Sequence, residues 1–195
     1  MKKILITGFD PFGGESINPA LEAVNRLPQK VGDYSLTKLT VPTVFGRAGD
    51  TVIAEAERIM PDVILCIGQA GGRRAVTPEV IGINLREARI ADNEGNVPEA
   101  LPVVKDAPAA YFSTLPVRDM VAAIKEKGID SQLSYSAGAF VCNDLLYTLL
   151  HKYDGTDTKV GFIHVPFLPE QAKEGVPSMP LETIVEAIRT AIEVI

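Results

Sequence analysis

The stretch DVILCIG, residues 62–68, is apolar on both of its faces and ends in a glycine. A strand that is buried on both faces is typical of the centre of a parallel sheet. This stretch therefore predicts the central strand of an α/β fold. Runs at residues 2–8, 35–44, 131–136 and 159–165 predict further strands.

The segments between these strands carry apolar residues at helical spacing. They predict helices over residues 19–27, 46–60, 116–128, 143–153 and 181–194. Asn18 and Pro19 suit the start of the first helix, and Gly128 suits the end of the third. Because strands and helices alternate, we expect one α/β domain over residues 1–195, with a mostly parallel sheet covered by helices on both sides.

The carboxyl ends of the strands are the expected place for a ligand, because open α/β sheets bind their ligands there. Three segments follow predicted strands and a fourth ends one, so all four can meet at this edge: Phe9–Gly14, Gln69–Gly72, Ala137–Cys142 and His164–Pro166. The less regular stretch Val80–Leu115 is rich in Pro, Asn and Asp. We expect it to form surface structure that borders the same site, since loops carry function disproportionately.

The composition excludes several classes of protein. A net charge of −6 without a cluster of Lys and Arg argues against a nucleic-acid surface. No apolar run approaches the roughly 20 residues that span a bilayer, and no cleavage pattern follows the amino-terminal residues, so we expect a cytoplasmic protein with no membrane partner. Two cysteines and two histidines without a CxxC pair predict no disulfide framework and no metal site.

Cys142 lies beside the predicted start of the helix at 143–153, and two interpretations of it stay open. Free cysteine is usually buried as a small hydrophobic residue. At a helix amino terminus, however, the macrodipole and the unpaired amides stabilise a thiolate and can hold an oxyanion. Cys66 lies in the middle of an apolar strand and is interpreted as a core residue.

A thiolate nucleophile needs an imidazole that carries the proton to the leaving group. His164 ends an apolar strand just before Pro166, so its ring can lie over the strand ends, and we favour a catalytic role for it. His151 lies late in a helix, where a contact with the helix dipole is the favoured interpretation. Glu79 stands among apolar neighbours and is the candidate for orienting the imidazole, with a surface salt bridge as the alternative.

The loop GFDPFGG, residues 8–14, fits neither the GxGxxG pattern nor the P-loop pattern. Its two aromatic residues, Phe9 and Phe12, suit an apolar pocket better than an anion. Simple packing of the loop is the alternative interpretation.

Six segments occur in the order and spacing of the pyroglutamyl peptidase I family of cysteine exopeptidases: TGFDPFGG, GQAGGR, TPE, ARIADN, SAGAFVCN and HVPFLPEQ. The chain resembles this family over essentially its whole length. The resemblance implies a three-layer α/β/α sandwich that removes an N-terminal pyroglutamyl residue from peptides and proteins. It also implies that no metal or organic cofactor takes part and that the chain forms a homo-oligomer, commonly a tetramer.

The resemblance further implies roles for individual residues. It implies a catalytic triad of Glu79, Cys142 and His164. In the mechanism that we expect for this triad, Arg89 is a weaker electrostatic helper at the oxyanion. The pocket for the lactam ring would draw on Phe9, Phe12, Gln69, Ile90, Phe140 and Val141. A pyroglutamyl group is an uncharged lactam, so a largely apolar pocket with few polar groups suits it.

One segment departs from the family pattern. After the glutamate the family usually has a basic residue, then Val and Ala, whereas this chain has Val80, Ile81 and Gly82. Glu79 and Asn84 keep their spacing, so the departure concerns local packing or substrate preference rather than the triad. Two competing functions are a thiol amidase that acts on another neutral amide and a non-enzymatic α/β module that binds a metabolite.

Overall fold

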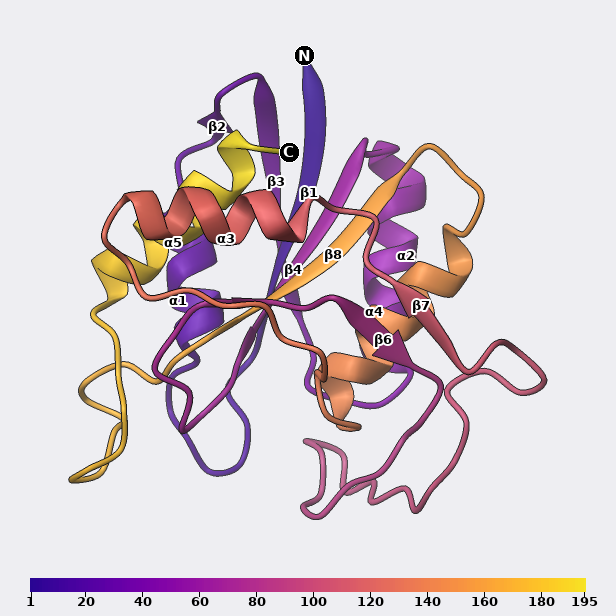
Figure 1. The fold of residues 1–195 in the computed structure, drawn as a ribbon. Helices are drawn as coiled ribbons and strands as arrows, with labels where there is room; N and C mark the ends of the chain where they lie inside the picture. Colours follow the sequence, from indigo (N-terminus) through magenta and orange to yellow (C-terminus); the bar gives the residue numbers. More distant parts are fainter.

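The computed structural model describes residues 1–195 and contains a six-stranded sheet with the strand order β2-β3-β1-β4-β8-β5 (Figure 1). The strands are β1 (Lys2–Phe9), β2 (Lys30–Val31), β3 (Tyr34–Val41), β4 (Val63–Gln69), β5 (Thr77–Pro78) and β8 (Lys159–Val165). The four long strands are parallel, whereas β2 and β5 pair antiparallel at the two edges. The predicted α/β fold with a mostly parallel sheet is confirmed, and residues 63–69 form the strand between β1 and β8.

Five helices cover the sheet: α1 (Pro19–Arg26), α2 (Arg47–Ile59), α3 (Val117–Glu126), α4 (Val141–Lys152) and α5 (Leu181–Glu193). Helices α1, α3 and α5 lie on one side of the sheet, and α2 and α4 lie on the other (Figure 1). The Asn18 side chain caps α1 as expected, because its Oδ1 accepts a hydrogen bond of 3.0 Å from the Ala20 N–H. None of the five helices combines the length and the apolar character needed to cross a membrane.

The long strands send alternate side chains into two separate hydrophobic clusters. On β8, Ile163 packs with α1, α3 and α5, whereas Phe162 packs with α2 and α4. Leu65 and Cys66 on β4 divide in the same way. Because side chains two residues apart share a face, the side chain of His164 lies on the same side as that of Phe162 and faces the α4 layer.

The stretch between β5 and α3 forms a small antiparallel sheet of β6 (Ile81–Ile83) and β7 (Ala110–Phe112), joined by long loops. This sheet lies beside α4 (Figure 1). A Cβ atom at Gly82 would be 3.2 Å from both the Leu146 Cγ and the Tyr147 backbone nitrogen, so glycine lets β6 approach the helix closely. The departure at residues 80–82 therefore affects the packing of β6 on α4.

The strand predicted at residues 131–136 is wrong. These residues form only isolated bridges, from Ser131 to Val76 and from Ser134 to Glu79. Their partner segment contains Pro78, which has no N–H to donate, so a continuous ladder cannot form between the two segments. Backbone hydrogen bonds on either side of Pro78 still hold the segments together.

Helix α4 begins two residues earlier than predicted, at Val141. Cys142 is therefore the second residue of the helix and not a residue that precedes it. Phe140 is the N-cap, with extended backbone angles and no capping hydrogen bond from its side chain.

Candidate active site

His164 and Glu79 form a buried pair at the carboxyl end of β8. The His164 Nδ1 lies 2.7 Å from the Glu79 Oε1, and the two side chains are 4% and 0% exposed. Strand β5 ends just before Glu79 and pairs antiparallel with β8, which brings the carboxylate beside the imidazole. The Phe162 ring packs against the imidazole with ring centroids 4.7 Å apart, so the orientation of His164 is fixed on two sides.

Cys142 lies beside the same strand ends. A Cβ atom at Gly68 would be only 3.0 Å from the Cys142 Sγ, and Gly68 is the register partner of His164 across β4 and β8. The lack of a side chain at Gly68 therefore leaves room for the sulfur next to the residue that pairs with the histidine. The structure thus brings Cys142, His164 and Glu79 to one edge of the sheet, as the sequence predicts.

Two neighbours of Cys142 hold the amino terminus of α4 in place. The Asn143 Oδ1 accepts a hydrogen bond of 3.0 Å from the Ile83 N–H, and its Nδ2 donates to the carbonyl oxygens of Ile83 and Leu85, at 2.9 Å each. The Asp144 carboxylate accepts a hydrogen bond from the Gly46 N–H at 2.9 Å and forms an ion pair with Arg86. The N–H groups of the first helical turn have no intrahelical acceptor and lie beside Cys142.

Arg73 contacts the buried carboxylate and was not predicted as a site residue. Its Nη1 lies 2.8 Å from the Glu79 Oε1 and 2.6 Å from the Thr77 Oγ1, and its Nη2 donates to the Ser136 carbonyl oxygen at 3.0 Å. A buried carboxylate needs partners for its charge, and this requirement together with the place of Arg73 in the segment GQAGGR could have indicated it.

The pKa shifts describe how the three groups are protonated at rest. Burial raises the pKa of Glu79, but its hydrogen bond and charge interaction with His164 and its contact with Arg73 outweigh burial, so the net shift is downward. Burial also lowers the pKa of His164, and this effect outweighs the opposing hydrogen bond from Glu79. The free protein at neutral pH thus holds an ionised Glu79 and a neutral His164.

The pKa of Cys142 is raised to about 12, first by burial and then by the charge of Glu79. The helix amino terminus was expected to favour the thiolate, but burial is the larger effect at this sulfur. Cys142 is therefore a thiol in the free protein, beside a neutral imidazole.

The chain matches known proteins along its whole length. A family model described as pyroglutamyl peptidase matches residues 2–195. The pyrrolidone-carboxylate peptidase of Bacillus thuringiensis (strain Al Hakam) is 52% identical over 100% of this chain and 93% of that protein. The chain belongs to the pyroglutamyl peptidase family. This membership confirms the recognition from the six segments and the predicted enzyme class, a cysteine-type pyroglutamyl peptidase.

Solved structures of the family have the same fold as this chain. Pyroglutamyl peptidase I of Bacillus amyloliquefaciens superimposes with a TM-score of 0.96 at 44% identity, covering 100% of this chain and 96% of that one. The pyrrolidone carboxyl peptidase of Thermococcus litoralis gives a TM-score of 0.94 at 38% identity, covering 100% and 93% of the two chains.

Four of the residues predicted for the lactam pocket of this pyroglutamyl peptidase divide into a buried pair, Phe9 and Val141, and an accessible pair, Phe12 and Phe140. Phe9 and Val141 are 2% and 0% exposed and belong to the hydrophobic cluster between the sheet and the α2–α4 layer. The Phe12 and Phe140 rings lie with centroids 6.1 Å apart, and Phe45 packs edge-on against Phe140 at 5.2 Å. Phe45 was not predicted, because nothing in its local sequence shows that it meets Phe140.

The remaining predicted pocket residues lie at the rim. The Gln69 Oε1 accepts a hydrogen bond of 3.1 Å from the Gln171 Nε2, which fixes the amide at the end of β4. Arg89 and Ile90 are exposed. They line an open cavity of about 810 Å³ together with Glu87, Gly138, Ala139 and Phe140.

Two motif residues of this peptidase, Asp92 and Asn93, tie the loops around the cavity together. Asp92 accepts hydrogen bonds from the Phe45 N–H and from the Asn96 side chain and backbone. The Asn93 Nδ2 donates to the Pro11 carbonyl oxygen at 3.0 Å. The segment ARIADN thus holds the loop after β1 and the loop before α2 against the insert between β6 and β7.

The other cysteine and the other histidine do not reach this edge. Cys66 is fully buried, its pKa is raised to about 12 by burial, and it packs in the core as predicted. The His151 Nδ1 lies 2.9 Å from the Tyr111 hydroxyl, and the His151 ring stacks on Tyr147. His151 therefore joins α4 to β7 and takes no part in the cluster around Cys142.

Proposed function

We propose that this pyroglutamyl peptidase uses Cys142, His164 and Glu79 as a catalytic triad to hydrolyse the amide bond after an N-terminal pyroglutamyl residue of peptides and proteins. The hydrogen bond of 2.7 Å between the His164 Nδ1 and the Glu79 Oε1, beside the Cys142 thiol, is the observation that supports this most strongly. The three side chains supply a nucleophile, a general base and an orienting carboxylate at the carboxyl ends of parallel strands.

Glu79 sets the tautomer of the imidazole. An ionised carboxylate only accepts hydrogen bonds, so the Nδ1 of His164 must carry the proton that it donates to the Glu79 Oε1. The Nε2 is then the unprotonated nitrogen and takes the proton of the Cys142 thiol. Glu79 also stabilises the imidazolium that this transfer creates.

The reaction proceeds through an acyl-enzyme. The Cys142 sulfur attacks the carbonyl carbon that joins the pyroglutamyl residue to the next residue, and the free N–H groups at the start of α4 stabilise the oxyanion. The His164 imidazolium then gives its proton to the leaving amine as the carbon–nitrogen bond breaks. Water, deprotonated by His164, hydrolyses the thioester and releases pyroglutamate.

The lactam ring binds beside the accessible aromatic rings of Phe12 and Phe140. An uncharged ring without a free amino group needs apolar contact and a few polar partners, not a carboxylate. Gln69 is the polar residue of the predicted pocket, and the hydrogen bond from Gln171 fixes its amide. Arg89 lies on the rim of the open cavity, where it acts as a weaker electrostatic helper.

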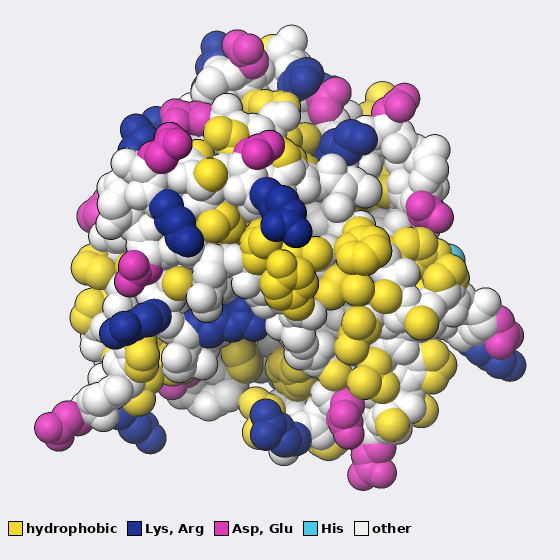
Figure 2. All heavy atoms as spheres, in the orientation of Figure 1, with side chains coloured by type: hydrophobic (Ala, Val, Ile, Leu, Met, Phe, Trp, Pro, Cys, Tyr) yellow, Lys and Arg dark blue, Asp and Glu magenta, His cyan; other side chains and the backbone are white.

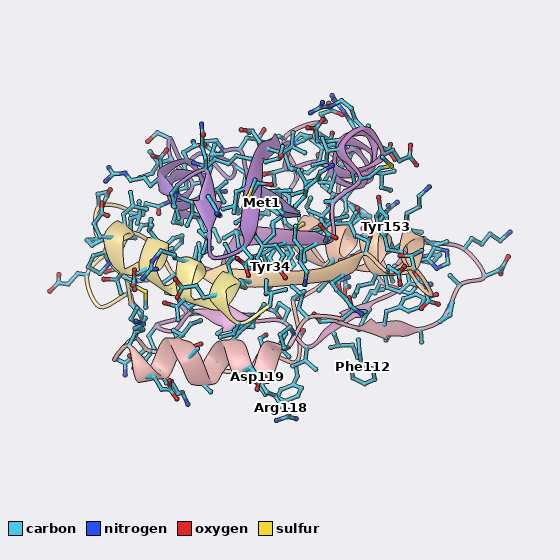
Figure 3. The ribbon with its side chains drawn as sticks, turned by 90° about the horizontal axis from the view of Figure 1, so that it is seen from above. Met1, Tyr34, Phe112, Arg118, Asp119 and Tyr153 are labelled. Carbon is cyan, nitrogen blue, oxygen red and sulfur yellow. The ribbon has the colours of Figure 1, made fainter.

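We further propose that the chain works as a homo-oligomer in the cytoplasm. Large apolar side chains are more than half exposed at Ile90, Leu101 and Phe112, all in the stretch between β5 and α3. Figure 2 shows hydrophobic side chains gathered over the region of β6 and β7, and Figure 3 shows Phe112 pointing away from the ribbon. A reducing compartment suits the chain because both cysteines are free and Cys142 must stay a thiol to react.

The proposal is tested by the release of a fluorogenic amine from its pyroglutamyl amide. We expect turnover by the reduced protein that both iodoacetamide and Cys142→Ala abolish, whereas the matched control Cys66→Ala keeps it. Turnover of another neutral amide in preference to the pyroglutamyl amide would favour the competing thiol amidase. Unchanged turnover by Cys142→Ala would rule out the assigned nucleophile.

A further inference from the structure

Arg73 is the charged residue closest to the proposed triad that has no place in the mechanism above. Its Nη1 lies 2.8 Å from the Glu79 Oε1, and the His164 Nδ1 lies 2.7 Å from the same oxygen. The Glu79 side chain is 0% exposed and the Arg73 side chain 29%, so the pair is shielded from most of the solvent. One carboxylate oxygen thus accepts from both the catalytic imidazole and a guanidinium.

The same guanidinium reaches the chain that leads to the nucleophile. The Arg73 Nη2 donates to the Ser136 carbonyl oxygen at 3.0 Å, and Ser136 lies six residues before Cys142. This stretch forms no regular strand, and the bond from Arg73 holds its start, while the Glu87 N–H donates to the Ala139 carbonyl oxygen nearer to Cys142. The planar fork of arginine has fixed donor directions, which suits it to hold two acceptors in one relative orientation.

We propose that Arg73 is a positioning residue of the peptidase reaction: it holds the Glu79 carboxylate and the segment before Cys142 in one fixed frame, so that His164 meets the thiol correctly. The inference rests on the proposed triad. The hydrogen-bond partners of Arg73 are Thr77, Glu79 and Ser136, and Arg73 does not line the open cavity beside Phe140.

The charge of Arg73 acts on every titrating group at this edge of the sheet. His164 faces Glu79 and Arg73, Glu79 faces His164, Ser134 and Arg73, and Cys142 faces Glu79, Cys66 and Arg73. Burial is the largest influence on each pKa, and Arg73 adds a downward contribution to all three. Removal of its charge therefore moves the pKa values of Glu79, His164 and Cys142 upward together.

The test compares pH profiles of kcat and KM for the wild type, Arg73→Met, Arg73→Lys and the neighbouring control Arg74→Met. In Arg73→Met we expect the acid limb of kcat/KM to move up by about one pH unit, because His164 must be neutral to accept the thiol proton. At pH values below the acid limb of the wild type this corresponds to a roughly tenfold lower kcat/KM, carried by kcat and not by KM. Arg73→Lys keeps the charge and hence the acid limb of the wild type, but loses kcat because an ammonium group cannot hold both acceptors.

Alkylation of Cys142 by iodoacetamide gives a second readout that needs no substrate. We expect its rate profile in Arg73→Met to move to higher pH, while Arg74→Met follows the wild type. Wild-type kcat and pH profiles in folded Arg73→Met, or equal losses in Arg73→Met and Arg74→Met, would overturn the inference. If Arg73→Met does not fold, Arg73→Lys decides, because a wild-type kcat in that variant contradicts the positioning role.

Failure of the proposed function gives a different result. If the wild-type protein releases no amine from the pyroglutamyl amide, the function is wrong. The alkylation profiles then still show whether Arg73 controls the thiol and its partners.

Discussion

Arg73–Glu79 and Arg86–Asp144 are two similar ion pairs with different tasks. In each, the carboxylate side chain is 0% exposed, and the arginine side chain is 29% and 25% exposed. Besides the arginine, Glu79 accepts a hydrogen bond from the His164 ring, whereas Asp144 accepts one from the Gly46 backbone N–H at 2.9 Å. The first pair is thus coupled to a titratable imidazole, and the second is coupled only to the backbone.

The comparison teaches that burial and charge pairing do not by themselves identify a catalytic carboxylate. Both carboxylates satisfy the rule that a buried charge needs a partner. What differs is the third member of each cluster, and it decides whether a substitution should affect activity or stability.

The largest expected effect comes from Glu79→Gln. The variant keeps the size of the side chain but removes the charge that orients His164 and stabilises the imidazolium, so kcat should fall on the order of 10³- to 10⁴-fold. Steady-state kinetics on a pyroglutamyl amide measure the effect on activity, and a thermal unfolding curve measures the effect on stability. If kcat of Glu79→Gln fell only as far as the unfolded fraction of the protein explains, the two ion pairs would not differ in their effect on activity.

Asp144→Ala, in the second ion pair, should lower stability and have little effect on activity. It leaves Arg86 without its counterion and the Gly46 N–H without its acceptor, which we expect to cost about 3 kcal/mol of unfolding free energy. Denaturant unfolding measures this cost. The folded fraction should keep kcat within about tenfold of the wild type, because Asp144 touches no reacting group. A kcat as low as that of Glu79→Gln would contradict the view that Asp144 stabilises the fold and takes no part in the reaction.

A smaller effect concerns the pH dependence of stability, which should depend on the Glu79 cluster. Burial lowers the pKa of His164 in the folded protein below its ordinary value, so the unfolded chain binds this proton more readily. Stability should therefore fall as the pH drops below about 6.5. The lowered pKa of Glu79 acts in the same direction at lower pH, where its contribution to stability is lost as the carboxylate becomes protonated.

Urea unfolding of the wild type and of His164→Gln between about pH 5 and pH 8 measures this dependence. The variant should show a flatter curve over the upper part of this range, since it lacks the imidazole. An equally steep curve in His164→Gln would place the acid sensitivity outside the cluster.

The parts of the fold that follow from local patterns were predictable. The apolar runs at β1, β4 and β8 and the helical spacing of the five helices each depend on residues close together in the chain. The stretch 131–136 was mispredicted because its pairing depends on Pro78, more than fifty residues earlier in the sequence. Strands β2 and β5 have only two residues each, too few to show an alternating pattern.

In the candidate site, too, features that depend on local sequence could be predicted, and contacts between distant residues could not. Cys142 and His164 could be proposed as candidates because their types and their positions next to predicted elements indicate chemistry. The contacts that hold them could not, because Arg86 meets Asp144 across 58 positions and Phe45 meets Phe140 only through the tertiary fold. Arg73 lies near Glu79 in the sequence, but the contact with Ser136 across 63 positions that gives it its role is not local.

The side chain of Asn143 has a consequence for protein engineering. Its amide makes, toward Ile83 and Leu85, the hydrogen bonds that a neighbouring strand would otherwise supply. The start of α4, which carries Cys142, is thus attached to the β6 segment by one peptide-like side-chain amide. We therefore expect changes in the loop beyond residue 93 to leave the sulfur in place, provided that this amide and the contacts of residues 83–93 are kept.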